Sequence, residues 1–174
     1  MPNPSKSLFY LKVYNQLNML KFNNTLDIGC GHLDLYKNIN TVKYYGLDID
    51  DLKSNIKKLK NIIFKKIDFN SFKTKSKFDL IACHEVININ NNYNKKKILT
   101  NFQKMINMLD KNGYISINFQ CSNSNNLNIE KKIYYLIKKN RLKIIYTFNY
   151  GLFHFQMNLF AYKIFYNLIK NFNF

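Results

Sequence analysis

The amino-acid sequence predicts an α/β domain built on a seven-stranded, mostly parallel sheet, with helices on both faces and an antiparallel last strand. Strand-like and helix-like segments alternate along most of the chain, and the last two strand-like segments follow each other directly. No internal repeat or Pro/Gly-rich linker divides the 174 residues. We therefore expect a single domain over 1–174, with a short N-terminal helix at 7–21 and a core at about 22–166.

The strands are predicted from short segments that are rich in β-branched and aromatic residues. In chain order they are 25–28, 42–47, 62–67, 78–82, 114–119, 142–148 and about 155–165. Because helices separate most of the first five, right-handed crossovers should bring the carboxyl ends of these strands to one edge of the sheet. Ligands of open parallel sheets bind at that edge.

The helices are predicted from apolar residues that recur every three or four positions. After the N-terminal helix they cover 33–40, a segment that begins at Asp51, 98–109 and 129–137. Lys111–Asn112–Gly113 is expected to end the helix at 98–109, which is the fourth helix of the chain, since glycine is common just after a helix. Asn-rich stretches at 88–94 and 122–126 are expected to be loops.

The composition argues against several classes of protein. No run of eighteen apolar residues occurs, so no membrane span is expected. The N-terminus lacks the pattern of a secretory signal, and the three cysteines are too few and too scattered for a disulfide framework, so we expect a cytoplasmic protein. Cys30, Cys83 and Cys121 each follow a predicted strand. They suit tight packing better than a cluster for a soft metal, and we expect no metal site.

The formal charge of +17 raises the question of a nucleic-acid partner, because lysine-rich surfaces bind phosphate. Arg141 is the only arginine, whereas nucleic-acid sites favour the planar fork of that side chain. Lys, Asn, Ile, Tyr and Phe, all with A/T-rich codons, dominate the chain, so a compositional bias explains the charge as well. A nucleic-acid partner is possible but not favoured.

Acidic residues mark the expected ligand-binding edge. The chain has only ten Asp and Glu residues, yet Asp27, Asp48 and Asp68 lie at the ends of the first three strands and Glu85 lies just past the fourth. Carboxylates that converge in so basic a protein repel one another unless a cationic or donor-rich ligand lies between them. The pattern therefore predicts a ligand with positive charge and hydrogen-bond donors.

The segment Asp27–Gly31 supplies two glycines where the backbone must approach that ligand closely. A dinucleotide fingerprint would continue with glycine at the position of Asp34. A carboxylate there would oppose a pyrophosphate, so a ligand with an ammonium, a sulfonium and an adenosine fits this loop better.

These motifs resemble those of class I S-adenosylmethionine-dependent methyltransferases, which have a Rossmann-like fold. Leu26–Gly31 is similar to the first motif of the family and Tyr45–Asp50 to its second-strand motif. Ile67–Phe69, 78–83 and 109–114 are similar to its later motifs, so the resemblance covers about residues 20–165. It implies S-adenosyl-L-methionine as cofactor, bound by Asp27, Gly29, Cys30, Gly31, Asp48, Ile49, Asp68, Phe69 and Cys83.

Within that resemblance, Asp27 and the two glycines would surround the methionine part of the cofactor. Asp48 would accept both ribose hydroxyls, and Asp68 would accept the adenine amino group. Many family members carry a third glycine at the position of Leu33, and this chain departs from the pattern there.

His84 and Glu85 lie where a methyl acceptor would approach, and they are the candidate catalytic residues. A histidine could take a proton from the acceptor, although in-line methyl transfer can proceed through alignment of the reactants alone. The chain lacks the Asn/Asp-Pro-Pro-aromatic turn of base N-methylation after the fourth strand, where it has Cys83–His84–Glu85–Val86 and no proline. It also lacks the lysine of ribose methylation, where it has Gln120.

We therefore predict an enzyme that methylates a small metabolite, lipid-like or sugar-like acceptor. An RNA or protein acceptor is the alternative enzyme function. A non-catalytic partner subunit that keeps the fold is a third possibility, because of Leu33 and the short N-terminal segment before the first strand.

Overall fold

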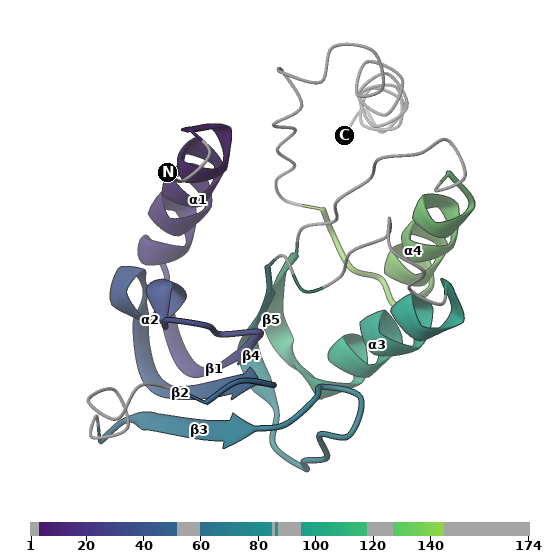
Figure 1. Ribbon diagram of the computed structural model, residues 1–174. Coiled ribbons are helices and arrows are strands. Elements are labelled where there is room, and N and C mark those ends of the chain that lie inside the picture. The colour runs from purple at the N-terminus through teal and green to yellow at the C-terminus, as the bar shows by residue number, and fades with distance from the viewer. Residues whose placement is uncertain (1–3, 52–59, 85, 87–94, 118–126, 145–174) are drawn as a thin grey trace.

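The computed structural model describes residues 4–51, 60–84, 86, 95–117 and 127–144, which form an α/β layer structure (Figure 1). In chain order the elements are α1 (Pro4–Asn18), β1 (Lys21–Ile28), α2 (Asp34–Asn38), β2 (Asn40–Asp48), β3 (Ile62–Lys66), β4 (Phe78–Cys83), α3 (Lys95–Met108), β5 (Leu109–Ile117) and α4 (Leu127–Lys139).

The five strands form one sheet in the order β3-β2-β1-β4-β5, and every neighbouring pair is parallel. The chain adds β2 and β3 on one side of β1 and then returns to add β4 and β5 on the other side. Asp27 of β1 thus lies beside Gly46 of β2 and Ala82 of β4. The order of the strands reverses between β1 and β4, and ligands of such sheets bind next to this switch point.

Helices cover both faces of the sheet, with α1 and α2 on one side and α3 and α4 on the other (Figure 1). Each face has its own hydrophobic core. Along β4, Leu80 and Ala82 point into the core under α1 and α2, whereas Ile81 and Cys83 point into the core under α3 and α4. All four side chains are at most 1% exposed, as expected for a central parallel strand.

A carboxylate joins the two central strands where they begin. Asp79 of β4 accepts hydrogen bonds from the backbone amides of Asn23 and Asn24 of β1, at 2.6 Å and 2.9 Å. Asp79 lies at the edge of the sheet opposite the carboxyl ends of the strands, so its hydrogen bonds stabilise the pairing of β1 with β4.

The predicted end of the fourth helix is wrong. The helix α3 ends at Met108 and β5 begins directly with Leu109, so Lys111–Asn112–Gly113 lies within a strand. The pairing of β4 with β5 shifts register between Phe78 and Leu80. A Cβ on Gly113 would lie 2.9 Å from the carbonyl oxygen of Phe78, so this glycine permits close strand approach.

The five-stranded parallel part of the predicted sheet is confirmed. The helix expected after Asp51 falls mostly on residues 52–59, outside the described residues, as does the strand at 155–165. Of the strand expected at 142–148, residues 142–144 are described and form no regular element. The seven-stranded count and the antiparallel last strand stay predictions. Within the described part of the chain, no helix is both long and apolar enough to span a bilayer.

Candidate active site

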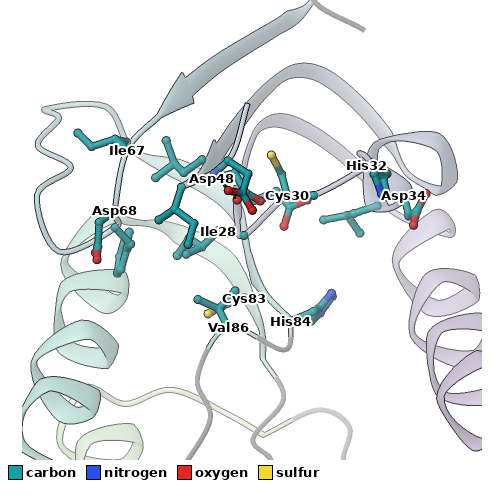
Figure 2. Close-up of a pocket in the computed structure, with 18 of the residues that line it drawn as sticks. Ile28, Cys30, His32, Asp34, Asp48, Ile67, Asp68, Cys83, His84 and Val86 are labelled. Carbon is teal, nitrogen blue, oxygen red and sulfur yellow. Dashed lines mark hydrogen bonds between the residues drawn. The ribbon is translucent and has the colours of Figure 1, made fainter. Parts of the chain in front are cut away.

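A cleft of about 910 Å³ opens at the carboxyl edge of the sheet (Figure 2). The loops after β1, β2, β3 and β4 line it, together with residues of α1 and α3. It contains every predicted site residue that the structure describes: Asp27, Gly29, Cys30, Gly31, Asp48, Ile49, Asp68, Phe69, Cys83 and His84. Glu85 lies outside the described residues.

The loop after β1 is held against β2 by its backbone amides. Gly29 and Cys30 both donate to the carbonyl oxygen of Leu47, at 2.8 Å and 3.0 Å, and Gly31 donates to Oδ2 of Asp48 at 2.8 Å. Gly29 has φ +72° and Gly31 has φ +46°, a region that favours glycine. A Cβ on Gly29 would also overlap the Val86 side chain. Both glycines are thus required by the backbone of the loop.

Asp27 is a buried carboxyl group at the base of the cleft. It is 4% exposed, and the hydroxyl of Tyr44 on β2 donates a hydrogen bond to its Oδ2. Burial raises the pKa of Asp27 to about 7; the Tyr44 hydrogen bond opposes this rise, and the nearby charges of Asp48 and Asp34 add to it. A cation in the cleft would favour the ionised form of Asp27.

Asp48 and Asp68 are more accessible carboxylates on the rim. Besides the Gly31 amide, Asp48 accepts the Asp50 amide through Oδ1 at 3.1 Å. Asp68 accepts the backbone amide of Asn70 through Oδ1 at 2.7 Å. This hydrogen bond is the main cause that lowers the pKa of Asp68, so its carboxylate stays ionised and able to accept donors from a ligand.

The charge of the cleft is opposite to that of the chain. Five of the ten acidic residues line it, namely Asp27, Asp34, Asp48, Asp50 and Asp68, in a protein with a net charge of +17. Donor-bearing cations are stabilised by such a site, and phosphate groups are repelled. The acidic lining fits a ligand with an ammonium, a sulfonium and paired hydroxyls.

Apolar side chains complete the lining. Ile49 is 67% exposed although it is aliphatic, and it stands at the rim directly after Asp48. Phe69, 7% exposed, and Ile67 line the cleft just after β3. Apolar groups beside carboxylates suit a ligand that carries a flat, poorly hydrated ring.

An aromatic cluster from α1 faces the end of β4, and sequence reasoning missed it. The ring centroids of Tyr10 and Tyr14 lie 6.0 Å and 6.5 Å from that of His84, and all three residues line the cleft. His84 points toward α1 (Figure 2), and its Nε2 lies 2.8 Å from the hydroxyl of Ser116 on β5. The spacing of Tyr10 and Tyr14, one helical turn apart, was the available signal.

The two described cysteines are buried free thiols. Burial is the main cause that raises the pKa of Cys30 and that of Cys83 to about 12, so neither is a thiolate near neutral pH. In the described ranges, no group of three His, Cys, Asp or Glu side chains could hold a metal ion. Cys121 lies outside the described residues.

Leu33 occupies the position at which the chain departs from the family pattern, and its backbone is left-handed. It has φ 59° and ψ 35°, and its side chain is 1% exposed in the core beneath α1 and α2. A left-handed conformation costs a residue with a Cβ about 1–2 kcal/mol. Leu33 thus has the left-handed backbone conformation that glycine would favour, and its side chain is buried in the core.

We expect Leu33→Gly to destabilise the protein no more than Leu33→Ala does. Both variants lose the buried side chain, at a cost of about 2–5 kcal/mol, but only glycine relieves the backbone strain. Chemical denaturation would measure the two free energies of unfolding. The same pair at Leu35, which is buried in α2, is the control, because there glycine should be worse by about 1 kcal/mol. Alanine proving the milder replacement at Leu33 would contradict the strain argument.

Comparison with known proteins agrees with this geometry. A family model described as "Methyltransferase domain" matches residues 21–149, which is most of the chain. A search of curated proteins gives no significant match.

Two of the similar structures are of the N-methyltransferase NodS from Bradyrhizobium japonicum WM9. The complex with S-adenosyl-L-homocysteine is 20% identical, with a TM-score of 0.56, and the match covers 66% of this chain and 61% of that one. The structure described without that ligand is 17% identical, with a TM-score of 0.61, and covers 77% and 83%. The chain thus spans less than two thirds of the complexed NodS chain.

A ribosomal protein L11 methylase from Lactobacillus delbrueckii subsp. bulgaricus is 14% identical, with a TM-score of 0.60 and coverage of 86% of this chain and 75% of that one. At such identities these likenesses show the fold, and the family model shows the membership. This chain belongs to the class I S-adenosylmethionine-dependent methyltransferases, a family whose cofactor is S-adenosyl-L-methionine.

Proposed function

We propose that this protein transfers the methyl group of S-adenosylmethionine to a small-molecule acceptor, a metabolite, lipid-like or sugar-like compound, by in-line displacement. The observation that carries the proposal is the convergence of Asp27, Asp48 and Asp68 on one cleft beside the exposed side chain of Ile49. The cofactor supplies an activated methyl group on a sulfonium. The rest of the reaction depends on how the chain holds the two reactants.

Three carboxylates would hold the cofactor by its separate parts. Asp48, already fixed by the Gly31 amide, would accept the ribose hydroxyls, and Asp68 would accept the adenine amino group near the Phe69 amide. Ile49 would cover one face of the adenine. Asp27, with Gly29, Cys30 and Gly31, would surround the methionine part, and Cys83 would close the base of the cleft.

The acceptor would enter between α1 and the end of β4. Tyr10 and Tyr14 form an uncharged wall there, which favours a compact organic acceptor over a phosphate backbone. In the transfer, the bond between methyl and sulfur breaks as the bond to the acceptor atom forms. His84 would take the proton that the acceptor atom releases, and Glu85, its neighbour in the chain, is a second candidate for that role.

Calorimetry with S-adenosylmethionine, followed by transfer of radiolabelled methyl groups to fractionated cell extract, tests the proposal. We expect micromolar binding and label in the low-mass fraction, with Asp48→Ala as the inactive control. Label that ribonuclease or protease releases would replace the small-molecule acceptor with RNA or protein. Wild-type protein that binds no cofactor would leave the non-catalytic subunit as the better explanation.

A further inference from the structure

Asn101 of α3 is a buried polar residue on the wall of the cleft. It is only 4% exposed and lines the cleft together with Met105 and Phe69. Among the residues that the structure describes, its side-chain carboxamide has no hydrogen-bond partner. Buried polar side chains are nearly always hydrogen-bonded, because leaving one unpaired costs free energy. The carboxamide of Asn101 is therefore suited to a partner that enters the cleft.

The position of Asn101 on the helix directs it toward the ligand. Lys97, Asn101 and Met105 are spaced by four residues and all line the cleft, so they form one face of α3. Ile98 and Phe102, which do not line the cleft, are buried in the core. Asn101 is the central residue of the face that α3 presents to the cleft.

A lysine one turn further along α3 holds the loop after β3 in place. The ammonium of Lys104 donates to the carbonyl oxygens of Phe69 and Asn70, at 2.5 Å and 3.1 Å, and lies 4.6 Å from the centroid of the Phe69 ring. The amide of the same Phe69–Asn70 peptide group donates to Oδ1 of Asp68. Lys104 thus ties the loop that carries Asp68 to the helix that carries Asn101.

We infer that Asn101 is a further cofactor-binding residue, whose carboxamide hydrogen-bonds the adenosine part of S-adenosylmethionine. The inference rests on the proposed function, which assigns the adenine to the neighbouring Asp68 and Phe69. A carboxamide offers a donor and an acceptor side by side, and this pair matches the edge of an adenine ring. It adds polar recognition to a wall on which Phe69 and Met105 supply only apolar contact.

The test compares Asn101→Leu with the wild-type chain in two measurements that should move in opposite directions. Leucine removes an unpaired buried carboxamide, so the melting temperature without ligand should rise by about 2–4 °C. The affinity for S-adenosylhomocysteine should fall about tenfold, the loss expected for a hydrogen-bonding group of the site. A purely structural asparagine would give a lower melting temperature instead, and that result overturns the inference.

Asn107→Leu is the matched control, because it makes the same replacement on the same helix at an exposed position outside the cleft. It should leave the affinity unchanged, and any gain in melting temperature from helix propensity should be smaller than that of Asn101→Leu.

A second ligand locates the contact. 5′-Methylthioadenosine shares the adenosine part but lacks the amino-acid part, so Asn101→Leu should weaken it by the same factor as S-adenosylhomocysteine. A loss confined to S-adenosylhomocysteine overturns the assignment to adenosine. If Asn101→Leu and the wild type bind both ligands equally well, the inference about Asn101 is overturned and the proposed function stands. If the wild-type chain binds neither ligand, both the inference and the proposed function are overturned.

Discussion

An Asp48→Ala variant is expected to bind S-adenosylhomocysteine at least about a hundredfold more weakly than the wild-type chain. The substitution removes the proposed acceptor for two ribose hydroxyls and also the carboxylate that holds the Gly31 amide at 2.8 Å. Hydrogen bonds to a charged group contribute about 1.5–3 kcal/mol each, so losing two of them corresponds to a hundredfold or more. Isothermal titration calorimetry measures the difference directly.

Two further variants separate the contributions of Asp48. Asp50→Ala removes another carboxylate of the cleft and should change the affinity by less than about threefold, because the loss of one exposed charge is largely screened. Asp48→Asn keeps an oxygen that can accept the Gly31 amide but loses the negative charge, so its affinity should fall between those of alanine and wild type. A folded Asp48→Ala protein with unchanged affinity is incompatible with the proposed ribose contact.

Asp27→Asn is expected to stabilise the protein above neutral pH. Burial raises the pKa of Asp27 to about 7, so the folded state keeps a proton that the unfolded state releases near pH 4. The free energy of unfolding of the wild type therefore falls as the pH rises from about 4 to 7, by on the order of 4 kcal/mol in total. Asparagine is neutral at every pH and can still accept the Tyr44 hydroxyl. At pH 8 it should stabilise the fold by about 2–4 kcal/mol.

The same substitution should weaken binding of S-adenosylmethionine. A cationic ligand favours ionised Asp27, so the wild-type affinity should rise with pH up to about 7, with release of a proton on binding. The Asp27→Asn variant can show neither effect, and we expect it to bind about tenfold more weakly at pH 8. Calorimetry in buffers of different ionisation enthalpy counts the released protons, and urea denaturation at pH 5.5 and pH 8 gives the stabilities.

Asp34→Asn is the matched control for Asp27→Asn, because Asp34 is an exposed carboxylate of the same cleft. Its replacement should alter stability by no more than about 0.5 kcal/mol at either pH. If Asp27→Asn proved no more stable than the wild type at pH 8, the raised pKa of Asp27 would be refuted, whatever the result for the cofactor.

The strands and their parallel pairing were predictable because each strand carries its own local signal. Leu80, Ile81 and Ala82 form a continuous apolar run that only a strand covered on both faces can bury. The acidic residues were informative for a similar reason: few occur in the chain, and three lie at the ends of consecutive strands. Parallel strands bring such residues together whatever the intervening sequence.

The end of α3 could not be predicted, because the signal for it is not local. Lys111–Asn112–Gly113 has the composition of a helix end, but Gly113 is required by the approach of the Phe78 carbonyl oxygen from another strand. The contributions of α1 and α3 to the cleft were missed on similar grounds. Tyr14 and Asn101 belong to helices, and which residue of a helix meets the ligand depends on how the helix packs.

The strand order also has a consequence for synthesis on the ribosome. β1 pairs with β2 on one side and with β4 on the other, so the central strand has an open edge until residue 83 has emerged. The carboxylates at the ends of β1, β2 and β3 are all translated before that edge is covered, while Asp79 has yet to reach the amides of Asn23 and Asn24. Nascent chains that stop before β4 should therefore expose a parallel strand edge, the part of this fold most prone to aggregation.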